Sequence, residues 1–173
     1  MAYLVLANGQ VFKGKRVGAA ADRVGELVFT TGMVGYIETL TDPSYYGQIV
    51  THTFPAIGNY GVIEADFEGD SALFGLIVRD LCDCPSNFRS GGALNEYLVR
   101  RGIPGLMGVD TREITQTVRE AGVMNAMICD AIPTDLSELK AYRVTNAVSA
   151  VTWIMIWMNT RLMKTSIMKR PWK

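Results

Sequence analysis

The fold of this chain is decided by residues 31–61, which read TGMVGYIETLTDPSYYGQIVTHTFPAIGNYG. The stretch holds five glycines and two prolines, and no helical period of apolar residues runs through it. It contains one strand pattern, at residues 48–54, in which Val50, His52 and Phe54 share one face. A long ordered loop inside a compact domain is more often functional than idle, so we expect this stretch to be functional.

Strand patterns lie on both sides of this loop. Residues 3–7 and 10–17 flank Asn8-Gly9, and two apolar runs separated by Asn-Gly predict a β-hairpin. Residues 26–30 predict another strand. The continuous apolar run at residues 73–78 predicts a strand that is covered on both faces.

Helical patterns occur only after residue 89. A helix is predicted over residues 91–101, with Ser90 as its N-cap and Gly102 as its stop. A second helix is predicted to begin at Asp110, whose carboxylate can accept hydrogen bonds from the first-turn N–H groups. The first half of the chain is therefore expected to be rich in strands.

The last elements of the pattern alternate. Residues 105–109 and 123–128 are expected to form short buried strands, one before and one after the second helix. A third helix is predicted over residues 135–143, capped by Thr134 or Asp135. A β-rich N-terminal half followed by β-α-β-α predicts a mixed α+β fold.

Composition excludes several classes of protein. Seventeen basic residues balance seventeen acidic ones, which argues against broad nucleic-acid or membrane-surface binding. Three cysteines form no disulfide framework, so reduced thiols and a cytoplasmic location are expected. The N-terminal apolar run is short and lacks a basic segment, so no signal peptide is expected.

The sequence offers few candidates for chemistry, and we expect neither a metal site nor a cofactor. Cys82 and Cys84 form a lone C-x-C, and its spacing to Cys129 and His52 matches no known zinc pattern. His52, the single histidine, is expected to be a half-buried core residue that is hydrogen-bonded. No glycine motif typical of a phosphate-binding loop follows a strand, so ATP binding is not expected.

A charged cluster opens the second predicted helix. Asp110 and Glu113 have the spacing of a capping box, which explains both acids without a catalytic role. Arg112 and Arg119 lie on the side of the helix away from its apolar stripe. They are interpreted either as a solvated face or as a face toward a partner.

The character of the chain changes at residue 153. Residues 153–173, WIMIWMNTRLMKTSIMKRPWK, hold all three tryptophans, five basic residues and no acidic residue. One interpretation is a short amphipathic membrane helix, although the apolar part is too short to span a bilayer. The preferred hypothesis is a non-native end produced by a frameshift or a truncated gene, which leaves residues 1–152 as the domain.

Five blocks of sequence carry a resemblance to a known family. They are TGMVGYIETLTDPSYYGQIV with FPAIGNYG in residues 31–61, GLIVRD (75–80), PSNFRS (85–90), DTREIT (110–115) and VREAGVMNAMI (118–128). With these blocks in order, residues 3–152 resemble the N-terminal domain of the small, glutamine-hydrolysing subunit of carbamoyl-phosphate synthetase.

The resemblance implies a swivelling β/β/α-type domain that docks on the large subunit and packs on a glutaminase domain. That glutaminase domain is expected to be absent from this chain. In the family, the small subunit hydrolyses glutamine and ammonia passes to the large subunit. The resulting carbamoyl phosphate feeds arginine and pyrimidine synthesis. Docking through surface loops and strand edges is expected, and the alternative is a stand-alone protein-binding or assembly module.

By resemblance, Ser44 contributes to glutamine binding, as half of a site that the glutaminase domain completes. No catalytic residue is expected in the chain. The family's nucleophile is the cysteine of a Gly-x-Cys-x-Gly turn, and none of the three cysteines has glycines in that arrangement. Asp83 lies between Cys82 and Cys84, and its negative charge disfavours a thiolate.

Overall fold

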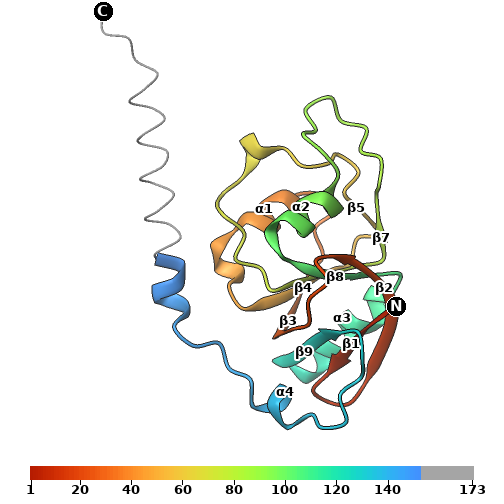
Figure 1. The fold of residues 1–173 in the computed structure, drawn as a ribbon, viewed down its shortest axis with the longest axis vertical. Coiled ribbons are helices and arrows are strands. Elements are labelled where there is room, and N and C mark those ends of the chain that lie inside the picture. Colours follow the sequence, from red (N-terminus) through yellow and green to blue (C-terminus); the bar gives the residue numbers. More distant parts are fainter. Residues whose placement is uncertain (153–173) are drawn as a thin grey trace, which may run out of the picture.

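The structure is a computed structural model that describes residues 1–152. The predicted non-native tail, residues 153–173, lies outside the described residues. Seven strands form a closed barrel in the order β1-β2-β8-β6-β4-β3-β9, and β9 pairs back to β1 (Figure 1). The barrel strands are β1 (Ala2–Leu6), β2 (Val11–Gly18), β3 (Arg23–Thr30), β4 (Gln48–His52), β6 (Gly75–Val78), β8 (Pro104–Met107) and β9 (Met124–Cys129).

The strand directions divide the barrel into two parts. The hairpin β1–β2 forms as predicted, and β9 is antiparallel to both β1 and β3. The strands β3, β4, β6 and β8 are parallel neighbours, so their carboxyl ends meet at one rim. Closure leaves no barrel strand with a free edge, so the expectation of docking through strand edges is wrong for the barrel. Among the described residues, free edges remain in the two-stranded sheet of β5 (Ala56–Ile57) and β7 (Asp80–Leu81).

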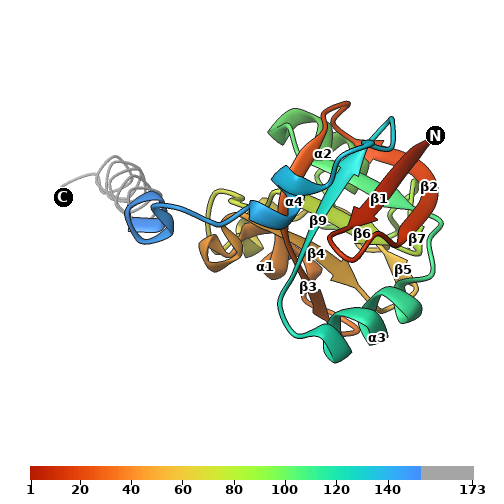
Figure 2. The same cartoon turned by 90° about the horizontal axis from the view of Figure 1, so that it is seen from below.

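The interior of the barrel is filled by aliphatic side chains from six of the seven strands. They are Leu4, Leu27, Ile49, Ile77, Leu106 and Ile128, and all are at most 1% exposed. The helix α3 (Thr111–Ala121) adds Ile114 and Val118 to this cluster and so covers part of the barrel (Figure 2). On β4, Ile49 faces this interior while Val50 faces a second cluster outside the barrel. The strand is therefore covered on both faces.

The loop from β3 to β4 contains a helix, α1 (Tyr36–Thr41), so the prediction that helices occur only after residue 89 is wrong. Tyr36, Ile37 and Leu40 are each 2% exposed and pack in the outer cluster. Their spacing is helical but spans less than two turns, which is too short for a periodic pattern to be visible in the sequence. A 3-10 helix, η1 (Pro43–Tyr45), follows, and a second, η2 (Glu64–Asp66), lies further along.

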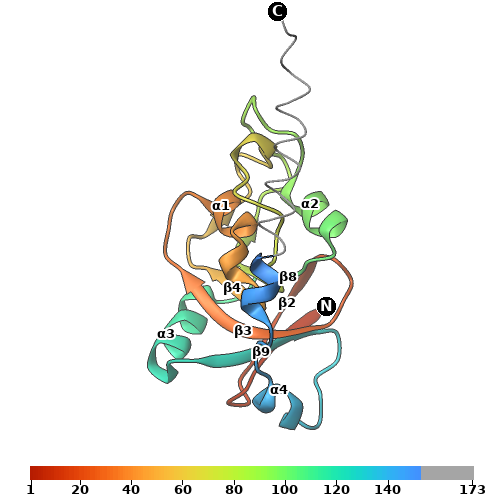
Figure 3. The ribbon, with the colours of Figure 1, turned by 90° about the vertical axis from the view of Figure 1, so that its left-hand side faces the viewer.

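The helix α2 (Leu94–Arg101) begins three residues later than predicted, and Ser90 does not cap it. The N-cap is Ala93, and the Ser90 hydroxyl hydrogen-bonds with the backbone of Gly92 instead. Gly91 N–H donates to the Val62 carbonyl, which holds this segment against a neighbouring loop before the helix can start. Gly102 ends α2 in the left-handed conformation, as predicted. The helices α1 and α2 lie on the same side of the barrel (Figures 1 and 3).

The bounds of the two later helices were predicted from the sequence with different success. Asp110 caps α3 as predicted, because its Oδ1 accepts from the N–H groups of Arg112 and Glu113 at 3.0 Å. The third predicted helix is shorter than expected, since α4 covers only Ser137–Ala141 and its N-cap is Leu136. Asp135 accepts from Ser137 N–H at 2.9 Å and forms a turn before the helix rather than its cap.

The predicted mixed α+β class is confirmed, and the order β8-α3-β9-α4 matches the predicted β-α-β-α pattern. The closed barrel itself was not predicted. Within residues 1–152, no helix has the length and apolar character needed to cross a membrane.

Candidate functional site

Ser44 lies on an ordered turn that we call the Ser44 turn, residues 42–47. Asp42 caps η1 by accepting from Ser44 N–H at 2.8 Å, so the Asp-Pro-Ser sequence sets the local conformation. The Ser44 side chain is exposed, while Pro43 beneath it is buried. The turn therefore presents a hydroxyl to solvent from a backbone that is held in place.

The C-terminal part of the domain passes directly beside this turn. Gly47 has a φ of +80°, and a Cβ added there would lie 2.8 Å from Val144. Tyr142 donates a hydrogen bond to the Gly47 carbonyl at 3.5 Å. Residues 142–144, the exit segment, thus pack against the Ser44 turn before the chain leads away from the barrel (Figures 1 and 2).

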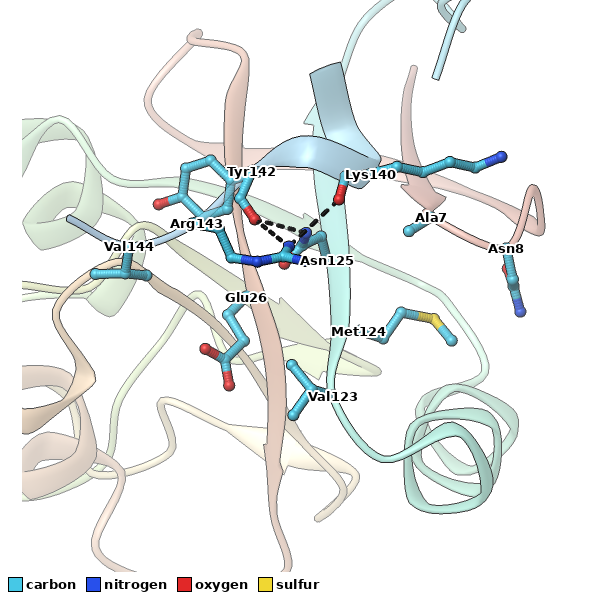
Figure 4. Close-up of a pocket in the computed structure, with 10 residues that line it drawn as sticks. All are labelled: Ala7, Asn8, Glu26, Val123, Met124, Asn125, Lys140, Tyr142, Arg143 and Val144. Carbon is cyan, nitrogen blue, oxygen red and sulfur yellow. Dashed lines mark hydrogen bonds between the residues drawn. The ribbon is translucent and has the colours of Figure 1, made fainter. Parts of the chain in front are cut away.

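A pocket of about 520 Å³ lies between the exit segment and the barrel wall (Figure 4). Asn125 of β9 is 9% exposed, and its side-chain amide donates to the carbonyls of Leu139 and Tyr142, each at 3.0 Å. Arg143 donates to the Tyr142 carbonyl at 2.7 Å. These bonds fix the end of α4 and the exit segment on the barrel.

Sequence reasoning missed Asn125. The signal was present, because Asn125 is the one polar residue in the apolar run of residues 123–128. A buried amide in such a run needs partners, and those partners lie in a segment that comes 14 and 17 residues later.

The charges around this pocket are mixed. Glu26 lines it from β3, and Lys140 and Arg143 line it from the C-terminal segment. Burial, with the nearby Tyr46, raises the pKa of Tyr142 above its usual range. The residues that line the pocket include no cysteine, serine or histidine.

His52 differs from its prediction. It is 2% exposed rather than half buried, and neither ring nitrogen has a hydrogen-bond partner within the described residues. Burial lowers the pKa of His52 to about 4, so the ring is neutral at physiological pH. The expectation of a core position is confirmed, but the expected hydrogen bond is wrong, because both ring nitrogens are buried at the end of β4 without a partner in the described residues.

The cysteines lie in three different environments. Cys82 is half-buried, and its thiol donates to the Cys84 carbonyl at 3.4 Å, while Cys84 itself is exposed. Cys129 is buried on β9, and burial, with the charge of Asp22, raises the pKa of its thiol. Within residues 1–152, no three His, Cys, Asp or Glu side chains gather closely enough to hold a metal ion.

The exposed arginines of α3 share a pocket with a third arginine. Arg112 and Arg119 line a second pocket together with Arg79, which lies between β6 and β7. The structure thus brings together two residues that the sequence placed on one helix face and a third that the sequence did not connect to them.

Comparison with known proteins identifies the class to which this barrel belongs. Residues 4–128 match the family described as "Carbamoyl-phosphate synthase small chain, CPSase domain", and the chain belongs to this family. The resemblance inferred from the five sequence blocks is confirmed.

The curated relatives agree. The chain is 48% identical over 153 residues to the carbamoyl phosphate synthase small chain of Bacillus thuringiensis subsp. konkukian, covering 86% of this chain and 42% of that protein. It is 53% identical over 122 residues to the pyrimidine-specific small chain of Bacillus subtilis, covering 70% and 34%. The small chain of Listeria innocua is 47% identical over 137 residues, covering 79% and 38%.

This chain therefore spans about two fifths of the length of the curated relatives it matches. Among solved structures, an aminopeptidase from Aneurinibacillus sp. strain AM-1 superposes with a TM-score of 0.42 at 16% identity, over 76% of this chain and 30% of that chain. A likeness this distant indicates neither the fold family nor the function of this chain.

Proposed function

We propose that residues 1–152 are the N-terminal docking and structural domain of the small subunit of a glutamine-dependent carbamoyl-phosphate synthase. The domain binds the large subunit, packs on a glutaminase domain where one is supplied, and does not catalyse by itself. It acts in the cytoplasm and supports carbamoyl phosphate synthesis for arginine and pyrimidine pathways. The family resemblance implies that the domain is of the swivelling β/β/α type, and a barrel with helices packed on it is consistent with that type.

The family match over residues 4–128 is the observation that carries this proposal. The arrangement of the described residues supports it. The pocket behind the exit segment and the pocket lined by Arg79, Arg112 and Arg119 are open and mix polar with apolar groups, and their lining residues include neither a cysteine nor a histidine. Surfaces of this kind suit the recognition of another protein better than a reaction at a buried centre.

The position of the exit segment supports a contact between Ser44 and a following domain. Val144 packs on Gly47, three residues from Ser44, so the chain leaves the barrel beside the Ser44 turn on its way to any domain that follows. The exposed Ser44 hydroxyl is then available to an amide substrate held by that domain. Residues 1–152 thus provide proximity in space between Ser44 and the exit segment rather than a complete site.

Docking is tested by mixing this protein with the purified large chain of a bacterial carbamoyl-phosphate synthase. We expect co-elution in size-exclusion chromatography at micromolar concentration, with a buried interface of more than roughly 1,000 Å² in total. Separate elution of the two chains would support the alternative, a stand-alone assembly module.

The role of Ser44 is tested in a protein that includes a glutaminase domain, in cis or in trans. Ser44→Ala should raise KM for glutamine by an amount equivalent to about 1 kcal/mol, for one lost neutral hydrogen bond. The effect should fall on KM rather than kcat, because the hydroxyl binds the substrate and stabilises no developing charge. Thr39→Ala, on the neighbouring helix, is the control. An unchanged KM would make Ser44 an ordinary turn serine.

A further inference from the structure

A pocket of about 500 Å³ lies at the rim where the carboxyl ends of the parallel strands meet. Thr53 follows β4, Arg79 follows β6, and α3 closes the far side with Arg112, Thr115 and Arg119. We call it the arginine pocket. It is separate from the Ser44 turn, since the two share no lining or packing residue.

The arginine pocket has a positive charge that the described part of the chain does not neutralise. Its three arginines are exposed, and no acidic residue lines it. Within residues 1–152, none of the three makes an ion pair, whereas Arg16 and Arg101 each have a carboxylate within 2.9 Å. The chain as a whole carries no net charge, so this concentration of cations is local.

Two of the threonine hydroxyls around the pocket are already used. The Thr53 hydroxyl donates to the Thr30 carbonyl at 3.0 Å, and the Thr115 hydroxyl donates to the Thr111 carbonyl at 2.7 Å. A small phosphate is usually held by backbone N–H groups at a helix N-terminus. Here the first N–H groups of α3 are satisfied by the Val109 carbonyl and the Asp110 carboxylate.

Besides the exposed amide of Gln116, the open hollow presents guanidinium groups on three long side chains. Such groups bind carboxylates in a bidentate manner, and three of them around one hollow can contact several carboxylates of one extended segment. The remainder of this chain does not supply them, because residues 153–173 contain five basic residues and no acidic residue.

We infer that the arginine pocket binds aspartate and glutamate side chains of an acidic segment on the partner protein. This inference rests on the proposed docking function and adds the chemistry of the contact. Arg112 and Arg119 form one side of the contact and Arg79 the other. Electrostatic attraction of this kind speeds association and fixes register, and it weakens as salt screens it.

The test uses the full chain, with the purified large chain of a bacterial carbamoyl-phosphate synthase as the probe. Dissociation constants are measured at about 50 and about 300 mM NaCl for wild type and for Arg79→Glu, Arg112→Glu and Arg119→Glu. Each reversal should weaken binding about tenfold or more at low salt, because a like charge then faces the carboxylates. The wild-type affinity should fall with salt more steeply than that of the variants.

Two variants serve as controls. Arg100→Glu reverses an exposed arginine on α2, outside the pocket, and should change binding by less than about twofold. Arg112→Lys keeps the charge but loses the bidentate geometry, so its affinity should lie between wild type and Arg112→Glu. Thermal unfolding of each variant should match wild type, since all of the substituted side chains are exposed.

The outcomes separate the inference from the function on which it rests. If wild type binds and the three reversals bind equally well, the inference is wrong while docking stands. If wild type does not bind, docking itself fails and the inference falls with it. A thermal stabilisation of wild type by inorganic phosphate or pyrophosphate that the reversals abolish would assign the pocket to free phosphate and overturn the inference.

Discussion

His52 is a titratable ring that is buried at the end of β4 without a hydrogen-bond partner in the described residues. Its pKa is lowered from 6.5 to about 4 by burial, because the charged ring would lose its hydration without gaining a partner. The unfolded chain binds a proton as pH falls through 6.5, and the folded chain binds it only near pH 4. The contribution of the neutral His52 ring to the stability of the fold is therefore fully present above pH 6.5. It is lost progressively as the pH falls from 6.5 to about 4.

We predict that the free energy of unfolding falls by about 2 kcal/mol between pH 7 and pH 5 through His52 alone. His52→Leu removes the titrating group and should flatten this part of the pH profile, whatever its effect on absolute stability. Urea unfolding at pH 7 and pH 5 measures the slope of the free energy of unfolding against pH for wild type and for the variant. Equal slopes in wild type and variant would show that the ring is hydrated or partnered.

At the scale of single elements, Asp110 and Ser90 show when a cap can be identified from sequence. Asp110 caps α3 through contacts two and three residues away, so sequence spacing alone contains the needed information. Ser90 precedes a helix pattern equally well, but Gly91 donates to Val62, on a loop distant in sequence. That tertiary bond holds the backbone and moves the start of α2.

Removal of the α3 cap gives a prediction at this scale. Asp110→Ala should destabilise the domain by about 1 kcal/mol, because two first-turn N–H groups lose their acceptor. Asp110→Asn keeps an oxygen at the same place and should retain most of the stability. Chemical denaturation measures both variants. A loss in Asp110→Asn as large as that in Asp110→Ala would assign the effect to charge rather than to the cap.

At the scale of the whole molecule, the closed barrel and its three core clusters lie within the described residues. The tail, residues 153–173, contains three tryptophans and no acidic residue. Exposed apolar residues of this kind promote association. We predict that deletion of residues 153–173 raises solubility and leaves a single cooperative unfolding transition. Non-cooperative melting of the truncated protein, seen by calorimetry, would show that the tail belongs to the fold.

The intact chain should not hydrolyse glutamine. The raised pKa of the buried Cys129 thiol and the lowered pKa of the single, buried histidine both oppose the formation of a thiolate–base pair. An ammonia-release assay with millimolar glutamine compares wild type with a triple alanine variant of Cys82, Cys84 and Cys129. Turnover in wild type that the triple variant loses would reveal a catalytic site in this chain.

The sequence by itself determined the family, the mixed class, most of the strands and the Asp110 cap, because these depend on residues that are close along the chain. Tertiary structure decided what depends on distant contacts. It closed the barrel by pairing β9 with β1, so that no strand edge remains there. It formed the short helix α1 by packing Tyr36 and Leu40 on the barrel.

The candidate sites divide in the same way. Ser44 was proposed from the sequence through the family resemblance, and the neighbouring Asp42 and Pro43 set the conformation of its turn. The pocket behind the exit segment depends on Asn125, whose partners lie on another element. The arginine pocket joins Arg79 to α3 only because β6 and β8 run parallel and place their carboxyl ends at one rim. Register between strands is a property of the folded sheet, so no local pattern could reveal that pocket.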